Sequence, residues 1–345
     1  MNRSNTIDLL RGFAVLIMIF ANSAPYFINL DQEYFLRFLF SLAAPIFLII
    51  TGYCSQISYR NNSSSLQKHL KRIVQIFFIG AFIDFVFWQA IPLISFDILY
   101  LIAISQLVLL IFRRSNALLF WLILLGVLVA NFMLHSNLNY RFDNPDYSWI
   151  NLDLDSLSRS NPVQRMIYDG WFPLFPWLGL VVLGALLPTF KYLLLRKSLY
   201  FVILGLGILA SSYYLLLGQT VEVRDDYLEL WYPAIGYSLF IPLAMYFLTM
   251  GLINVEIKGA SIFGQFLKIL GRNSLFVYFI DAMLIAMVSF FDLKIGTETF
   301  LFNSLYLVVL IVLIFLCTVL IDTMRNKQVW NAVPWFVKYI LGFNK

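Results

Sequence analysis

The stretch IDLLRGFAVLIMIFAN, residues 7–22, decides the fold because it combines an apolar core with polar residues at its two ends. Asp8 and Arg11 are three positions apart and share one face of a helix. Asn22 follows Arg11 by eleven residues, about three helical turns, so the two side chains lie on one face roughly 16 Å apart along the axis. The segment predicts a transmembrane helix with a face that is polar at both ends.

This polar face has two interpretations. In the structural interpretation, Arg11 extends toward the lipid headgroups and Asn22 hydrogen-bonds a neighbouring helix. In the functional interpretation, the face lines a site that reaches across the membrane. The spacing alone is compatible with both.

Apolar stretches of similar length recur along the rest of the chain. Hydrophobic residues make up 61% of the 345 positions, and charged residues only 12%, about half the usual share of a globular domain. A bilayer accommodates such a chain in helices of about 20 residues. We therefore predict an all-α, polytopic membrane protein with about ten transmembrane helices in one bundle, at residues 7–27, 35–57, 70–90, 96–112, 117–134, 171–188, 198–217, 233–253, 274–291 and 300–321.

The charges in the loops give the chain a direction. Cytoplasmic loops are rich in Lys and Arg, and the acidic residues gather in the opposite connections, chiefly in the long loops 135–170 and 218–232. Both termini are therefore expected in the cytoplasm. The basic side holds Arg3, Arg60, Lys68, Lys71, Arg72, Arg113, Arg114, Lys191, Arg196, Lys197, Lys258, Lys268, Arg272, Arg325, Lys327, Lys338 and Lys345.

Several classes of function are disfavoured by the same composition. The basic residues are spread over many loops rather than gathered in one patch, so nucleic acid is not an expected partner. Cys54 and Cys317 lie in apolar segments, and His69 and His135 are far apart, so no metal site is expected. Residues 1–325 are expected to form the transmembrane domain, and residues 326–345 an interfacial or cytoplasmic tail.

Two carboxylates lie inside predicted helices, Asp84 and Asp281. Because a charge in lipid is costly, each is expected to face the bundle interior and to have a partner, whether its role is structural or functional. His135, at the outer end of its helix, is either a satisfied interface residue or a catalyst. Asn273 or Ser274 is expected as the N-cap of the helix at 274–291.

The entry of the helix at 171–188 reads DGWFPLFPWLG, residues 169–179. Its two prolines, three positions apart, leave backbone carbonyls free and suit the rim of an outer-facing cavity. Trp171 and Trp177 fit a belt of aromatic residues at the membrane interface.

Five segments in order resemble the transmembrane acyltransferases, in the branch of heparan-α-glucosaminide N-acetyltransferase and its bacterial relatives. The wider group usually has His where this chain has Asn22, and the spacing from Arg11 to Asn22 matches the narrower branch. The resemblance is carried by residues 7–22, 43–52, 96–106, 172–179 and 270–278.

The resemblance implies transfer of an acetyl group from cytoplasmic acetyl-CoA to an amine or hydroxyl of a sugar or glycan on the far side. It also implies an integral protein of the bacterial cytoplasmic (inner) membrane. The expected partners are bilayer lipids and a small-molecule or glycan acceptor, with a homodimer as a candidate assembly. Residues expected to bind the phosphates of CoA are Arg11, Lys68, Lys71, Arg72 and Arg272.

At the outer side, the resemblance gives Asn22 a catalytic role in orienting the thioester carbonyl or stabilising an oxyanion. The acidic outer loops favour a cationic or neutral acceptor, and Asp169, Trp171 and Asp281 are expected to bind it.

The chain departs from the family pattern at the general base. The family has a His in its first outer loop, but residues 25–33 contain none. Asp31 lies close to that position, and His135 is the alternative base. Asp281 stands where relatives commonly carry His. The departures are compatible with a divergent acyltransferase or with an inactive relative.

Two other functions remain open. A sugar or lipid transporter or flippase would use Asp84 and Asp281 as coupling or substrate sites. The chain shows neither paired broken helices nor an inverted repeat, which disfavours a transporter. A non-catalytic membrane partner is the third hypothesis, and acetyl-CoA binding distinguishes the first hypothesis from the other two.

Overall fold

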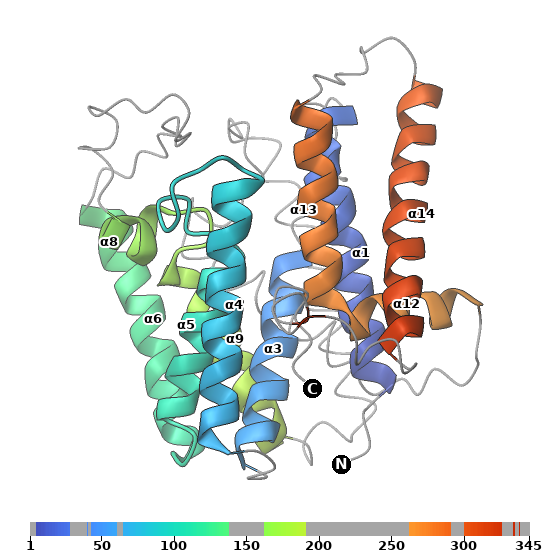
Figure 1. Cartoon of the computed structure of the whole chain (residues 1–345). Helices are drawn as coiled ribbons and strands as arrows, with labels where there is room; N and C mark the ends of the chain where they lie inside the picture. Colours follow the sequence, from blue (N-terminus) through green and yellow to red (C-terminus); the bar gives the residue numbers. More distant parts are fainter. Residues whose placement is uncertain are drawn as a thin grey trace. The chain divides into compact units, whose positions relative to one another are not determined.

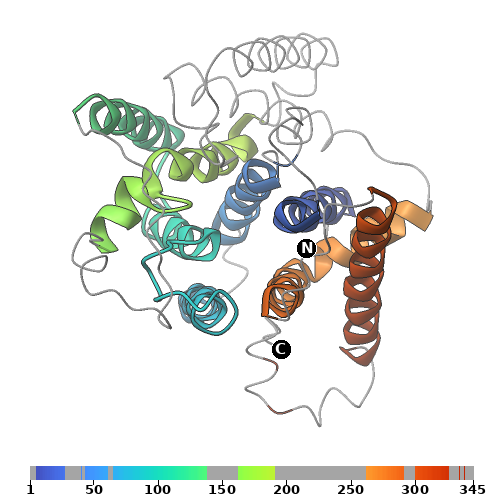
Figure 2. The ribbon, with the colours of Figure 1, turned by 90° about the horizontal axis from the view of Figure 1, so that it is seen from above.

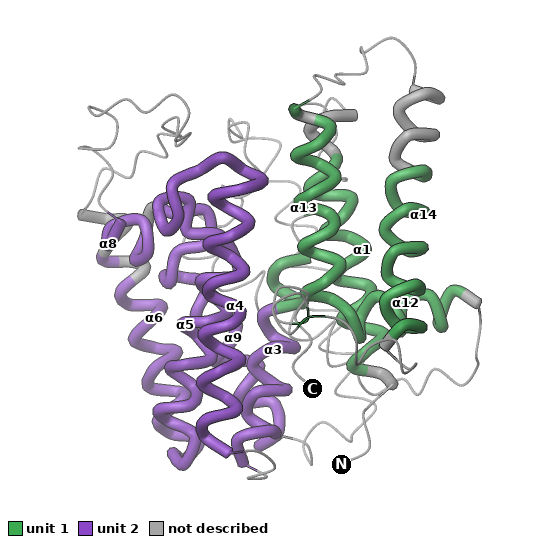
Figure 3. Tube along the Cα trace, in the orientation of Figure 1, with its two compact units in different colours: residues 1–47, 200–231, 243–345 green, residues 48–199, 232–242 purple. Residues whose placement is uncertain are grey.

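A computed structural model of the chain describes residues 5–27, 40, 43–60, 65–137, 162–190, 262–290, 300–325, 334 and 338 (Figure 1). These residues form helices joined by short turns, and no strand occurs among them. The predicted all-α class is therefore confirmed for the described part. Two compact units are distinguished, residues 1–47, 200–231 and 243–345 as unit 1, and residues 48–199 and 232–242 as unit 2 (Figure 3).

Unit 1 is built around its first helix. Helix α1 (Asn5–Phe27) packs against α12 (Ile262–Arg272), α13 (Ser274–Phe290) and α14 (Phe300–Arg325), and α14 also contacts α12 and α13 (Figure 1). Segments from opposite ends of the sequence therefore lie side by side. A small apolar cluster in unit 1 is formed by Ile17, Ala21, Phe40 and Ala43.

Two glycines bring α1 and α12 into backbone contact. A Cβ atom added to Gly12 would lie 1.8 Å from the carbonyl oxygen of Leu267. A Cβ atom added to Gly271 would lie 1.9 Å from the carbonyl oxygen of Asp8. Small residues at helix crossings allow such close approach. The crossing sets the first turns of α1 against the last turn of α12.

The sequence did not predict α12, because Lys268 and Arg272 favoured a loop before the helix at 274–291. Its buried residues nevertheless recur at helical spacing, at Gly264, Leu267 and Gly271. The axis bends by 89° between Phe263–Arg272 and Ser274–Val288. The apolar pattern of α12 is too short and too mixed with polar residues to resemble a span.

Unit 2 contains the part of α3 (Ala43–Arg60) from Leu48 onward, together with a helical bundle. Helix α4 packs against α5, and α9 packs against both α5 and α6. The ribbons of α4, α5 and α6 lie alongside one another in Figure 1, and Figure 2 shows the same unit from above, with α4 viewed nearly end on. The elements are α4 (Leu66–Val86), α5 (Ile98–Ile111), α6 (Ala117–Asn137), α8 (Pro162–Gln164), the π-helical turn η2 (Arg165–Asp169), α9 (Leu174–Leu186) and the 3-10 turn η3 (Leu187–Phe190).

The predicted helix positions agree with the described ones within a few residues for α1, α4, α5, α6, α9, α13 and α14. The predictions at 198–217 and 233–253 lie outside the described residues, as do most of 28–42 and most of the tail. Taken singly, no described helix is long and apolar enough to qualify as a membrane span, whereas the bent pair Phe263–Arg272 and Ser274–Val288 qualifies together. The ten-helix bundle therefore stays a prediction.

The entry of α9 is interrupted, as its two prolines predicted. Pro173 precedes the helix, and Phe175 has the non-helical dihedrals φ −105° and ψ 118°. The side chain of Trp177 is buried inside unit 2 and touches Phe172, so it contacts protein on its described sides. Trp171 is half-buried.

Candidate functional site

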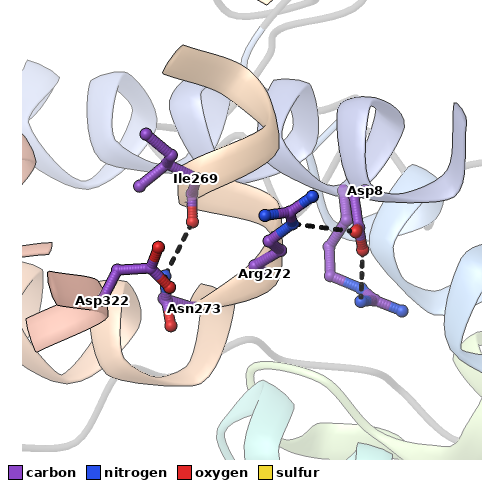
Figure 4. Close-up of polar contacts among 6 residues, drawn as sticks. Asp8, Ile269, Arg272, Asn273 and Asp322 are labelled. Atoms are coloured by element: carbon purple, nitrogen blue, oxygen red, sulfur yellow. Dashed lines mark hydrogen bonds and ion pairs between the residues drawn. The ribbon is translucent and has the colours of Figure 1, made fainter. Parts of the chain in front are cut away.

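Asp8 is the centre of a charged contact in the first turns of α1. Its side chain is buried, and its Oδ1 lies 3.8 Å from Nη1 of Arg11. Its Oδ2 accepts from Nε of Arg272 at 3.4 Å, across the crossing with α12 (Figure 4). Both guanidinium groups remain partly exposed. Two guanidinium groups share one carboxylate, so the cluster has a net positive charge. That charge and the exposed N–H groups suit an anionic ligand.

Asn273 ties this end of unit 1 to α14. Its Nδ2 donates to the carbonyl oxygen of Ile269 at 3.0 Å and to Oδ1 of Asp322 at 3.3 Å (Figure 4). Asn273 does occupy the position before α13, and its backbone carbonyl accepts from the N–H of Val277 at 2.9 Å, but its Oδ1 accepts no hydrogen bond within the described part of the chain and so caps nothing there. The side chain turns back toward α12 instead of capping α13.

The other polar end of α1 contacts a buried carboxylate. Nδ2 of Asn22 donates to Oδ2 of Asp281, on α13, at 2.8 Å. Asp281 is fully buried, and its Oδ1 has no hydrogen-bond partner among the described residues. The hydroxyl of Ser23, the next residue on α1, is likewise buried without a partner in that part of the chain. Two unsatisfied polar atoms in one buried region are uncommon in native structures.

Both interpretations of the polar face of α1 contribute to this picture. Asn22 does hydrogen-bond a neighbouring helix, as the structural interpretation expected. Its partner is Asp281, a residue that the resemblance led us to expect at the acceptor. The bent α12–α13 pair supplies the contacts at both ends, Arg272 for Asp8 and Asp281 for Asn22. Sequence spacing gave no sign of these pairings.

In unit 2, three of the expected CoA-binding cations, Lys68, Lys71 and Arg72, lie exposed at the start of α4. His69 lies in the same turn of α4, and its ring packs edge-on against Tyr59 with 4.6 Å between centroids. The hydroxyl of Tyr59 donates to the carbonyl oxygen of Gln106 at 3.3 Å.

Burial lowers the pKa of His69, and the positive charges of Arg113 and Arg72 lower it further. Burial also raises the pKa of Tyr59 to about 12. Arg113, which loop charge placed on the same side of the membrane as Lys68, Lys71 and Arg72, therefore lies close enough to His69 to act on its pKa. A neutral imidazole beside several cations favours an anionic ligand over a cationic one.

The substitution His69→Gln is expected to flatten the loss of stability at acidic pH. The pKa of His69 is lower in the folded protein than in the unfolded chain, so the unfolded chain binds the proton first. Stability from the neutral ring is present above the unfolded pKa of about 6.5 and is lost as pH falls below it. Thermal unfolding of the wild type and of His69→Gln between about pH 7.5 and pH 5.5 measures this pH dependence. If the melting temperatures of the two proteins fell equally with pH, the prediction would be contradicted.

Asp84 has the partners that its position inside a helix required. Its Oδ2 accepts from the hydroxyl of Ser95 at 2.7 Å and from that of Tyr100 at 2.9 Å. Its Oδ1 is buried and has no partner among the described residues. Sequence reasoning did not identify Ser95 or Tyr100, which face Asp84 from the next loop and helix.

The loop between α4 and α5 is strained around this network. Gln89, Leu93 and Phe96 have φ values of 51°, 73° and 47°, which non-glycine residues rarely adopt. The backbone N–H of Trp171 donates to the carbonyl oxygen of Ser95 at 2.9 Å. Trp171, expected at the acceptor, is therefore fixed to the loop that carries Ser95.

The remaining predicted residues are only partly described. Asp31 lies outside the described residues. His135 lies in α6 and Asp169 in η2, and the structure describes the backbone but not the side chain of each. The predicted residues that the structure brings into contact are Asn22 with Asp281, and Arg11 with Arg272 through Asp8.

Comparison with known proteins gives one family. A family model described as "Heparan-alpha-glucosaminide N-acetyltransferase, catalytic" matches residues 3–220, which is more than half of the chain. The matched region includes Asp8, Arg11 and Asn22 but ends before Arg272 and Asp281. No curated protein matches the chain.

Proposed function

The chain belongs to the heparan-alpha-glucosaminide N-acetyltransferase catalytic family, and from this premise we propose that it transfers an acetyl group across a membrane. The donor is acetyl-CoA on the cytoplasmic side, and the acceptor is an amine or hydroxyl of a sugar or glycan on the other side. The observation that carries this proposal is the pairing at both ends of α1, with Arg11 and Arg272 at one end and Asn22 with Asp281 at the other.

The distribution of apolar side chains supports a bilayer as the surroundings. Large apolar residues are exposed along α6 and α14, while buried polar groups face the interior of each unit. Water disfavours such an arrangement and hydrocarbon favours it. Loop charge places both termini in the cytoplasm in this proposal. The exposed residues are Leu118, Trp121, Leu122, Leu125, Val129 and Met133 on α6, and Val308, Val309, Val312, Leu313, Leu316 and Leu320 on α14.

The donor end is assigned to the cations. Arg11 and Arg272 are held by Asp8 with their guanidinium groups partly exposed, which suits bidentate contacts to phosphate. Lys68, Lys71 and Arg72, which are exposed on α4 of unit 2, stay residues predicted from the sequence to bind CoA.

The reacting end is assigned to the amide of Asn22. An Asn amide carries two N–H bonds, and Asp281 accepts one of them. We assign the second to the thioester carbonyl oxygen, where it would stabilise negative charge in the transition state. Trp171 and Asp169, which belong to unit 2, stay predictions from the sequence for binding of the acceptor.

The substitution Asn22→Ala tests this function. Membrane vesicles with labelled acetyl-CoA and D-glucosamine are expected to give labelled product with the wild type, and about 10²–10³-fold less with the variant. Asn116→Ala is the matched control, because Asn116 is exposed and, among the described residues, accepts from the backbone N–H of Leu119 at the start of α6. Equal rates for wild type and Asn22→Ala would contradict the catalytic assignment.

A sugar or lipid transporter is the second candidate. The observation that favours it is the presence of two buried carboxylates, Asp84 and Asp281, each with one oxygen that lacks a partner among the described residues. Flux of labelled D-glucosamine into vesicles without acetyl-CoA would support transport. Acetylation that requires acetyl-CoA, with no flux in its absence, would support the acetyltransferase.

A further inference from the structure

We propose that Asp281 is the general base that removes the proton from the attacking group of the acceptor, and that Asn22 holds it in place. The inference rests on the proposed acetyl transfer and assigns the step for which the first outer loop supplies no His. It concerns a residue beyond the region that matches the family model.

The geometry of Asp281 suits this role. One carboxylate oxygen, Oδ2, is fixed by Nδ2 of Asn22 at 2.8 Å, so the side chain has a defined orientation. The other oxygen, Oδ1, is buried and has no hydrogen-bond partner among the described residues. Buried carboxylate oxygens are normally hydrogen-bonded, and in a membrane they mark functional positions with a named partner. A donating N–H or O–H of the acceptor would complete the coordination.

Asp281 also lies where the base is needed. The amide of Asn22, which is assigned to the thioester carbonyl, contacts Asp281 directly. A general base must be within hydrogen-bond reach of the proton that it removes. An acceptor that donates to Oδ1 of Asp281 is therefore held beside the carbonyl carbon that it attacks.

The step balances in atoms and electrons. The acceptor nitrogen, as the free amine, attacks the carbonyl carbon of acetyl-CoA and forms a C–N bond. The C–S bond breaks, and the CoA thiolate leaves with the electron pair. The proton from the nitrogen moves to Oδ1 of Asp281 and then passes to the thiolate. The products are the N-acetylated sugar, CoA as its free thiol, and Asp281 restored as a carboxylate.

The first test is Asp281→Asn, which keeps the shape and an oxygen that accepts from Asn22 but cannot take up a proton. The rate constant kcat for labelled acetyl transfer to D-glucosamine is expected to fall about 10²–10⁴-fold, while KM for acetyl-CoA changes by less than about twofold. N-acetylglucosamine, which lacks the free amine, is the control acceptor. Thr318→Val is the matched control for a buried polar residue of unit 1.

The second test separates a base from a structural residue. Asp281→Ala leaves space for a small carboxylate, and added formate is expected to raise its rate about tenfold without affecting Asp281→Asn. A purely structural residue would show no such rescue.

The outcomes are distinguishable. A wild type that transfers no label from acetyl-CoA to added sugars or to the glycans of the vesicles overturns the proposed function itself. An active wild type with an equally active Asp281→Asn, or an Asp281→Ala that formate does not rescue, leaves the proposed function in place and overturns the inference.

Discussion

Gly12→Ala is expected to lower the free energy of unfolding by about 3 kcal/mol, the upper part of the usual range for overpacking. The added methyl group would lie 1.8 Å from the carbonyl oxygen of Leu267 and 2.6 Å from its carbonyl carbon. These are backbone atoms, so no side-chain rotation relieves the clash and α1 must separate from α12. Separation would also lengthen the contact between Asp8 and Arg272. Thermal or denaturant unfolding in detergent measures the change.

The matched control is Gly126→Ala in α6, where an added Cβ atom meets nothing within 4 Å in the described structure. This variant is expected to gain about 0.5–1 kcal/mol from the higher helix propensity of Ala. Gly271→Ala should behave like Gly12→Ala, and the double variant should lose less than the sum, because both act on one crossing. If Gly12→Ala resembled Gly126→Ala, the backbone contact would be disproved.

Residue spacing in the sequence predicted side-chain contacts between residues of the same helix. The pairing of Asp8 with Arg11 followed from their three-residue separation, and the structure confirms it at 3.8 Å. The need of Asp281 for a partner followed from the cost of a charge in lipid. Local spacing could not name that partner, because Asn22 is 259 residues away in sequence, and Arg272 is 264 residues from Asp8.

The side-chain positions of Asn273 and Trp177 differ from the sequence-based expectations for the same physical reason. Asn273 occupies the cap position before α13, but its amide turns toward α12 and α14, which approach it only in the folded chain. Trp is a residue type that is common at membrane interfaces, yet the side chain of Trp177 is buried in the packing of unit 2. Hydropathy describes how apolar a segment is, whereas the choice of neighbour depends on crossings such as that of Gly12 with Leu267.

Asp84→Ala is expected to lower the free energy of unfolding by about 3 kcal/mol, because it leaves two buried hydroxyls without their acceptor. Ser95 and Tyr100 both donate to Oδ2 of Asp84, and both are buried. The carboxylate also helps to hold the loop that carries Leu93 and Phe96 at positive φ, a conformation that costs about 1–3 kcal/mol for each such residue. Unfolding in detergent, with limited proteolysis at this loop, checks both effects.

A mutant cycle determines whether the three side chains act as one network. In a Ser95→Ala/Tyr100→Phe background, the hydroxyls that Asp84→Ala would orphan are already absent. Asp84→Ala should therefore cost about 1–2 kcal/mol less there than in the wild type, since contacting residues of one network are not additive. An equal cost in both backgrounds would show that Asp84 stabilises unit 2 independently of the two hydroxyls. A smaller cost would mean that the network, rather than the charge alone, keeps the strained loop in place and with it the backbone contact to Trp171.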